Sequence, residues 1–231
     1  ACATFEELGW DEKAGESDDD RERRTTALSL MMYSEDKEVL NEAKTRFDNN
    51  KLEDLPTEIR ALIISANVRH FETPEITENL FAAYKNTPSN DLQNDIAIGL
   101  TSTKNPETAE KILANIKDSN IIRPQDASRW FVYLIRTRES RQIAWNWLKE
   151  NWAWVEDTFG DDKSYDDFIR YAATALLTTD ELNDFRQFFE PMMDIPALAR
   201  TIKLGFTEIS ARVELIERDK ADVLSALQTT L

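Results

Sequence analysis

The sequence predicts an all-α protein, arranged as a curved α-solenoid of antiparallel helix pairs. Only 5 of the 231 residues are Gly, while the helix-favouring residues Ala, Leu, Glu, Lys and Arg are abundant. Few segments alternate Val, Ile or Thr with polar residues, as a half-buried strand would. Helix-start signals also recur at a nearly constant spacing along the middle of the chain. Together these observations favour stacked helical hairpins over a mixed fold.

Prolines mark most of these helix starts. Proline is favoured at the first helical position, because its missing N–H would have no partner there in any case. Thr73 and Asn105 precede prolines and are good N-cap residues, and Ser89 can cap a helix between them. Apolar-periodic segments open at Pro56, Pro74, Pro106 and Pro124. We therefore expect helices to begin near residues 56, 74, 89, 106, 124 and 140.

The starts are spaced like a helical-hairpin repeat. Pro74 and Pro106 are 32 residues apart, and Pro106 and Ser140 are 34 residues apart, enough for two short helices and two turns. The Trp/Gly/Tyr pattern of tetratricopeptide repeats is absent, so the spacing indicates structural repetition without a repeat family. Stacked hairpins of this size predict a superhelix like that of HEAT or armadillo repeats, with one concave surface.

The remaining elements complete the predicted domain, which spans residues 1–231. Residues 1–17 are expected to form an irregular lead-in, and residues 18–231 the helical repeats. The run Asp18-Asp19-Asp20 fits first-turn acids that complement a helix dipole better than a calcium loop, because the EF-hand spacing is missing. Further helices are expected at residues 18–32, 36–49, 140–159, 164–177, 180–189, 196–217 and 220–228.

Composition excludes several classes of function. With 28 Lys and Arg against 44 Asp and Glu, the net charge is −16, so a nucleic-acid partner is not expected. No apolar run approaches the about 20 residues that span a bilayer, so no membrane partner is expected. The single Cys cannot pair within the chain, which favours a reducing, cytoplasmic location. Five scattered glycines form no phosphate-binding loop.

The single histidine limits the chemistry further. A zinc hydrolase site needs at least two His, so this chain has no zinc site of its own. A catalytic triad through His70 stays open, but no Gly-x-Ser-x-Gly elbow accompanies it, and a structural or solvated role is favoured. Cys2 lies where a chain end usually frays, so a positioned nucleophile there is not expected.

Five of the six tryptophans lie between residues 130 and 154. Trp145, Leu148, Trp152 and Val155 recur at helical spacing on one face, which favours core packing. A stacking platform for bases or sugars remains the alternative, although nucleic-acid stacking normally accompanies a positive groove.

The segment just before Trp130 is the candidate binding site. Gln125 and Asp126 stand in the first turn of a helix, where they could cap unpaired N–H groups locally. Arg123 and Arg129 flank the same helix start and would form a positive locus suited to holding a carboxylate. Both interpretations, structural and ligand-facing, remain open.

An ordered set of segments resembles the C-terminal helical domain of zinc aminopeptidases of the aminopeptidase N family, from about Phe5 to the end. At the front these segments are Leu8-Gly9-Trp10, Gly15-Glu16-Ser17 with Arg24, and Glu38-Val39 through Ala43 to Arg46-Phe47. Further along they are Ile122-Arg123-Pro124-Gln125-Asp126, Ala144-Trp145-Asn146-Trp147-Leu148-Lys149-Glu150-Asn151-Trp152, Thr179-Asp180-Glu181-Leu182 and Ile209-Ser210-Ala211-Arg212-Val213.

The resemblance implies a curved solenoid that leans over an upstream catalytic domain of the same polypeptide and closes a chamber around a peptide substrate. That upstream domain would carry the His-Glu-x-x-His zinc site and a Gly-x-Met-x-Asn segment, and neither motif occurs here. The parent enzyme would remove N-terminal residues from peptides, whereas this chain alone would have no catalytic residue. Arg123, Gln125 and Asp126 match the family's string and are expected to face the chamber, while Arg129 is added from the helix-start geometry. Extracellular members often carry disulfides in this domain, so one Cys favours a bacterial, cytoplasmic type.

The chain does not begin with Met, and we expect it to be cut from a longer protein. The alternative is a free-standing helical-repeat scaffold that binds protein partners in its groove. A domain separated from its catalytic neighbour should expose an apolar patch, whereas an independent scaffold should have polar ends.

Overall fold

The computed structural model describes residues 1–162 and 164–230, and every regular element within these ranges is a helix. The all-α prediction is therefore confirmed. The chain divides into two compact units, Ala1–Ile112 and Leu113–Leu231, and the boundary between them falls inside helix α7. That residues 1–231 act as one domain stays a prediction.

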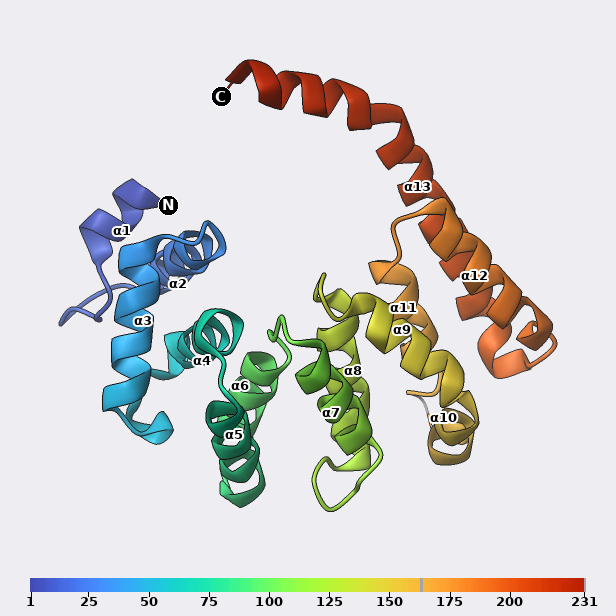
Figure 1. Ribbon diagram of the computed structural model, residues 1–231, viewed down its shortest axis with the longest axis horizontal. Helices are drawn as coiled ribbons and strands as arrows, with labels where there is room; N and C mark the ends of the chain where they lie inside the picture. Colours follow the sequence, from blue (N-terminus) through green and yellow to red (C-terminus); the bar gives the residue numbers. More distant parts are fainter. Residues whose placement is uncertain (163, 231) are drawn as a thin grey trace. The chain divides into compact units, whose positions relative to one another are not determined.

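The first unit contains six complete helices and the start of a seventh (Figure 1). Helix α4 packs against α3 and α6, and α5 packs against α6. The elements are α1 (Cys2–Leu8), α2 (Asp18–Tyr33), α3 (Lys37–Asn49), a 3-10 turn (Leu52–Asp54), α4 (Thr57–Phe71), α5 (Pro74–Asn86), α6 (Asn90–Leu100) and α7 (Pro106–Ile116).

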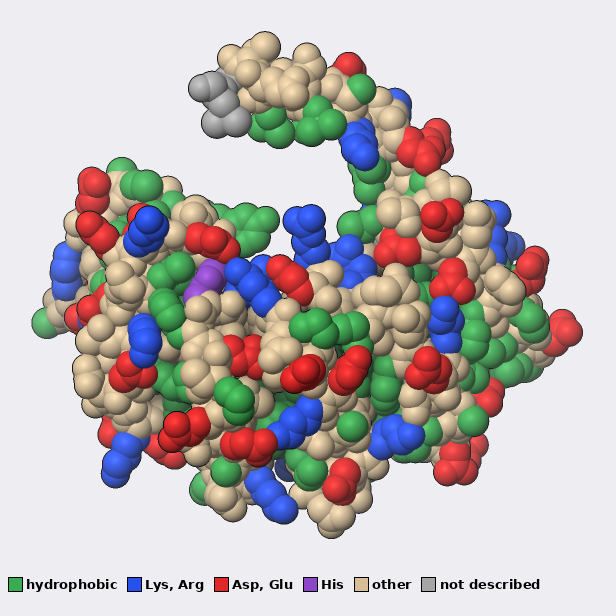
Figure 2. Space-filling view, viewed as in Figure 1, with side chains coloured by type: hydrophobic (Ala, Val, Ile, Leu, Met, Phe, Trp, Pro, Cys, Tyr) green, Lys and Arg blue, Asp and Glu red, His purple; other side chains and the backbone are tan. Residues whose placement is uncertain are grey.

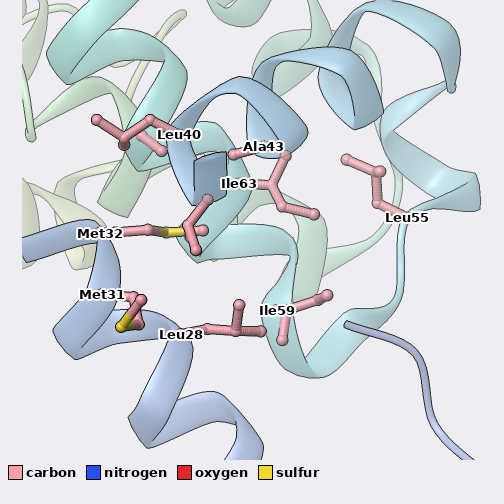
Figure 3. Close-up of a cluster of buried hydrophobic side chains, with 10 residues drawn as sticks. Leu28, Met31, Met32, Leu40, Ala43, Leu55, Ile59 and Ile63 are labelled. Carbon is pink, nitrogen blue, oxygen red and sulfur yellow. The ribbon is translucent and has the colours of Figure 1, made fainter. Parts of the chain in front are cut away.

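Apolar side chains from α2, α3 and α4 meet in the core of this unit (Figure 3). Leu28, Ala43 and Ile63 are fully buried there, one from each of these helices. Gly99 of α6 allows a close approach to α4, because a Cβ at this position would lie 2.8 Å from the Cβ of Ile64. This packing fixes the ends of α4, α5 and α7, which line a pocket described below.

Among the residues that the structure describes, the second unit contains the end of α7 and six further α-helices. Helix α11 packs against α8 and α13, and α12 packs against α13. The elements are α8 (Pro124–Arg136), α9 (Arg141–Glu150), α10 (Trp152–Phe159), α11 (Asp167–Ala175), α12 (Thr179–Phe189), a 3-10 turn (Glu190–Met192) and α13 (Pro196–Thr230).

Proline and cap positions predict the helix starts to within one residue. Pro74 and Pro124 occupy the first turn of α5 and α8, and Pro106 opens α7. Thr73 and Ser89 accept hydrogen bonds from the first-turn N–H groups of α5 and α6, at 3.2 Å in both cases. The predicted starts near residues 56, 74, 89, 106, 124 and 140 are thus confirmed.

The lead-in at residues 1–17 was expected to be irregular, and this is wrong for Cys2–Leu8, which form α1. The helix is stabilised by tertiary contacts, because Leu8 is buried, the ring of Phe5 packs edge-on against Trp10, and α1 lies against α2. Gly9 follows in the left-handed region with φ 67°, a conformation that glycine adopts without a steric penalty and that ends the helix.

The structure divides one predicted helix and joins two others. The expected helix over residues 140–159 is broken at Asn151, whose side-chain amide donates to the carbonyl of Trp147 at 2.8 Å and competes with the helical pattern. The expected helices over 196–217 and 220–228 are one continuous helix, α13. The charged run from Glu217 to Lys220 contains no Gly or Pro, so nothing in it interrupts the helix.

Several helices pack on their sequence neighbour or on the helix two places along, as in α3–α4–α6 and α11–α13, while α11 also packs on α8, three places back. Stacked hairpins require the first two kinds of contact. The curved superhelix itself concerns both units together and stays a prediction.

Candidate functional site

The predicted binding segment lies at the start of α8. Ile122 is fully buried and anchors the turn that precedes the helix, and Pro124 occupies the first helical turn. Arg123 is the N-cap residue, and its Nε donates to Oδ2 of Asp126 at 2.8 Å. The side chain of Arg123 is 49% exposed and that of Asp126 is 13% exposed. The structure therefore brings these two predicted residues into direct contact, across one turn.

Gln125 and Arg129 are exposed and stand four positions apart on α8, so they share one face of the helix. Neither shares the buried face, which Ala127, Trp130 and Phe131 form. Asp126 bonds locally to Arg123, as the structural interpretation expects, and Arg123, Gln125 and Arg129 are exposed. The chamber-facing role of these residues stays a prediction.

The tryptophans beside this segment belong to the core. Trp130, Trp145 and Trp152 are buried, as core packing predicts. The ring of Trp145 stacks on Phe185, with centroids 5.9 Å apart and planes inclined by 22°. Trp152 meets Phe189 edge-on at 5.2 Å. Aromatic pairs in these geometries stabilise a core beyond the area that they bury.

A carboxylate holds this aromatic cluster to the neighbouring helix. Asp184 of α12 accepts hydrogen bonds from Nε1 of Trp145 and Nζ of Lys149, both at 2.6 Å. Burial tends to raise the pKa of Asp184, but the bonds from Lys149 and Trp145 outweigh it and lower that pKa. The family-like segment that contains Trp145 and Lys149 is thus explained by packing of α9 against α12.

Other family-like residues also have structural partners. Thr178 and Glu181 form a capping box at the start of α12. Nη1 of Arg212 donates to the carbonyls of Ala173 at 2.9 Å and Leu176 at 2.8 Å, at the end of α11. Unpaired carbonyls at a helix C-terminus are stabilised by a cation.

A buried ion pair joins two of the family-like residues at the front of the chain, Glu16 and Arg24. A guanidinium nitrogen of Arg24 in α2 contacts a carboxylate oxygen of Glu16, and both side chains are almost fully buried. The bond from Arg24 is the main cause that lowers the pKa of Glu16. These segments therefore belong to the scaffold.

The first unit contains a pocket of about 500 Å³ that the sequence did not predict. Residues at the end of α4 and at the starts of α5 and α7 line it, including Arg69, His70, Glu72, Lys104 and Lys111.

Glu72 organises the polar wall of this pocket. Its carboxylate accepts hydrogen bonds from the hydroxyls of Thr77 at 3.2 Å, Thr103 at 2.6 Å and Thr108 at 2.5 Å. All three threonines are buried. They lie 5, 31 and 36 positions from Glu72. Sequence spacing carries no signal for such a cluster, because the fold alone brings these positions together.

His70 is the only histidine in the chain and lines the same pocket. Burial lowers the pKa of His70, and the positive charges of Lys104 and Arg69 add to this effect, while Glu35 opposes it. Lys104 is itself paired with Glu35 at 3.2 Å. The imidazole is therefore held in its neutral form more strongly than in an unfolded chain.

Within residues 1–162 and 164–230, no three side chains of His, Cys, Asp or Glu are grouped so that they could hold a metal ion. In the same part of the chain, no helix combines the length and the apolar character needed to cross a bilayer.

Comparison with known proteins matches residues 3–211 to a family described as the ERAP1-like C-terminal domain. A protein named Aminopeptidase N from Lactococcus lactis subsp. lactis is 34% identical over 226 residues, which are 97% of this chain and 27% of that protein. Aminopeptidase N from Lactobacillus helveticus is 32% identical over 95% of this chain and 26% of its own length. Aminopeptidase M1 from Arabidopsis thaliana is 27% identical over 93% of this chain and 25% of its own length. The chain thus spans about a quarter of the length of these curated relatives.

Proposed function

Because this chain belongs to the ERAP1-like C-terminal domain family, we propose that it is the non-catalytic C-terminal domain of a longer zinc-dependent aminopeptidase. The parent enzyme would remove N-terminal residues from peptides. The observation that carries this proposal is the near-complete match of the chain to one quarter of proteins named Aminopeptidase N. Catalysis would belong to the upstream part of the same polypeptide.

The zinc ion in this proposal also belongs to the upstream part. Zinc aminopeptidase chemistry needs a water that a metal ion activates, held by at least two His and an acid. This chain has one His and one Cys, and its described residues offer no group of three ligands. The residues present therefore do not fit the metal, and no step of the reaction is assigned to them.

A direct experiment tests this division of labour. The full-length polypeptide should hydrolyse an aminoacyl anilide and lose that activity with a zinc chelator. The 231-residue chain incubated with zinc and the same anilide should show no turnover. If the 231-residue chain does hydrolyse the anilide, and if His70→Ala abolishes that hydrolysis, the result would instead support an independent hydrolase.

We propose further that this domain closes the substrate chamber and holds the peptide through the start of α8. Arg123 and Arg129 are exposed residues at a helix start, where the N–H dipoles also favour an anion. The ligand would be the carboxylate of a peptide bound in the chamber. Gln125 would add a neutral hydrogen-bonding group beside it, and Asp126 would hold Arg123 in position at 2.8 Å.

The dependence of KM on peptide length tests this role. In the full-length enzyme, Arg123→Ala should raise KM for longer peptides more than for a dipeptide, because only a longer peptide reaches from the zinc to α8. Arg138→Ala, at an exposed position just past the end of α8, is the matched control and should leave both values unchanged. Equal changes for short and long peptides would argue against carboxylate binding by Arg123.

A cytoplasmic location is also proposed. The single Cys cannot form a disulfide within the chain, which suits a reducing compartment. Fractionation of the source cells, with an antibody against this domain, tests the location.

A further inference from the structure

The apolar stripe of α13 continues beyond the part of the second unit that covers it. Helical spacing places the following residues on one face: Leu198, Ile202, Ile209, Val213, Ile216, Val223 and Leu227. The first four are buried, whereas Ile216 is 37% exposed, Val223 is 53% exposed and Leu227 is 55% exposed. The apolar positions therefore continue at the same helical spacing beyond Val213, although the side chains at these later positions are exposed.

Exposed hydrophobic side chains are concentrated on this helix. Among the described residues, six of the nine large hydrophobic side chains that are exposed belong to α13. Figure 2 shows hydrophobic side chains along one side of the helix near its C-terminal end. We call residues 216–229 the distal segment. An exposed apolar face of this kind, interrupted only at Lys220, marks an interaction surface.

The distal segment has little support from the rest of the second unit. The last long-range bonds that tie α13 to it come from Arg212, which reaches α11, and from Glu217, which accepts a hydrogen bond from Thr179 at 2.8 Å. Beyond Glu217, the residues up to 229 are exposed apart from Asp219, which is half-buried. An isolated helix of about 12–15 residues is only marginally stable in water. The distal segment extends a helix that is already nucleated, but its exposed apolar side chains gain little burial within the second unit.

We propose that the apolar face of the distal segment, formed by Ile216, Val223, Leu224 and Leu227, docks on the remainder of the longer polypeptide. This inference rests on the proposed function, which makes the chain one domain of a larger enzyme. The relatives are about four times as long as the matched segment, so most of the polypeptide lies outside this structure.

Charge argues against a second copy of this chain as the occupant. Each copy has a net charge of −16, so two copies repel one another. Lys220 also stands within the stripe, between Ile216 and Val223. Antiparallel pairing of two such helices centred near this position would set the two lysines against each other. A different surface, apolar with a carboxylate opposite Lys220, avoids this repulsion.

Hydrogen–deuterium exchange of the full-length polypeptide tests the proposal without any substitution. Backbone amides of the distal segment should exchange slowly, as in a docked helix. Rapid exchange in this segment, alongside slow exchange in residues 198–213, would overturn the proposal.

Paired variants identify the surface. Val223→Asp combined with Leu227→Asp should speed exchange in the distal segment by about tenfold or more, because two apolar side chains lose their burial. Ser225→Asp, on the opposite face of the same helix, should leave exchange within about twofold of wild type. Equal effects of the two variants would overturn the proposal.

Two further outcomes separate this proposal from its rivals. Light scattering of the full-length polypeptide should show no dimer that forms through the apolar face of the distal segment. A dimer that Val223→Asp with Leu227→Asp dissociates, while Ser225→Asp does not, would make a second copy the occupant and overturn the proposal. Loss of slow exchange in an active enzyme would refute the docking alone, whereas slow exchange in a polypeptide without aminopeptidase activity would refute the proposed function and support the docking.

Discussion

Arg212 is predicted to act as a cap for α11, and its replacement by Met should destabilise the second unit. Nη1 of Arg212 donates to the carbonyls of Ala173 and Leu176, at 2.9 and 2.8 Å. Hydrogen bonds that involve a charged group contribute about 1.5–3 kcal/mol each. A cation at a helix C-terminus adds about 0.3–1 kcal/mol. Because Arg212 is only half-buried, we expect the lower end of the sum, about 3 kcal/mol.

The assay is urea and thermal unfolding of the 231-residue chain, followed by circular dichroism at 222 nm, a general marker of helix (about 3.6 residues per turn). A loss of about 3 kcal/mol should lower Tm by about 6–12 °C for a chain of this size. The matched control is Arg218→Met on the same helix, because Arg218 is exposed and forms its ion pair with its neighbour Asp219. The control should change Tm by less than about 2 °C. Equal effects of the two substitutions would refute the assignment of Arg212 as a cap.

Two further predictions concern the first unit. Gly99→Ala should destabilise it by about 1–2 kcal/mol although Ala favours helices, because the new Cβ would overlap Cγ2 of Ile64, an atom that Ala at position 64 lacks. The effect should shrink when Ile64 is also replaced by Ala, and a raised urea midpoint for Gly99→Ala would contradict the packing of α4 on α6. Titration of the single imidazole signal by proton NMR should give His70 a pKa below its ordinary 6.5, because burial and, after it, nearby cations disfavour the protonated form. Lys104→Gln removes one of these cations and should raise the pKa of His70. A lowered pKa means that the unfolded chain binds the proton more tightly, so stability should fall as the pH drops below about 6.5, and a measured value at or above 6.5 would contradict this.

Local chemistry explains why the helix starts could be predicted. Pro74, Pro106 and Pro124 act within the turn that they open, and the side chains of Thr73 and Ser89 bond N–H groups three residues ahead. These interactions involve neighbours in sequence, so a single sequence contains the information. The burial of Trp145 and Trp152 was predictable from their spacing, although they lie on separate helices, α9 and α10.

Long-range contacts explain what the sequence did not predict. Asn151 breaks the helix where its Oδ1 accepts a hydrogen bond from Lys117 at 2.7 Å, 34 positions away. The pocket at Glu72 depends on hydroxyls that the fold brings from 31 and 36 positions away. At the start of α8, the binding role that the sequence suggests stays a prediction, and the structure adds that Arg123 and Asp126 contact each other.

The coding sequence upstream of Ala1 tests the central claim most directly. Translation of the continuous reading frame should reveal His-Glu-x-x-His and Gly-x-Met-x-Asn a few hundred residues before this chain. A frame that closes shortly upstream, or one that encodes a long domain without either motif, would contradict the assignment of this chain as the C-terminal domain of a zinc aminopeptidase.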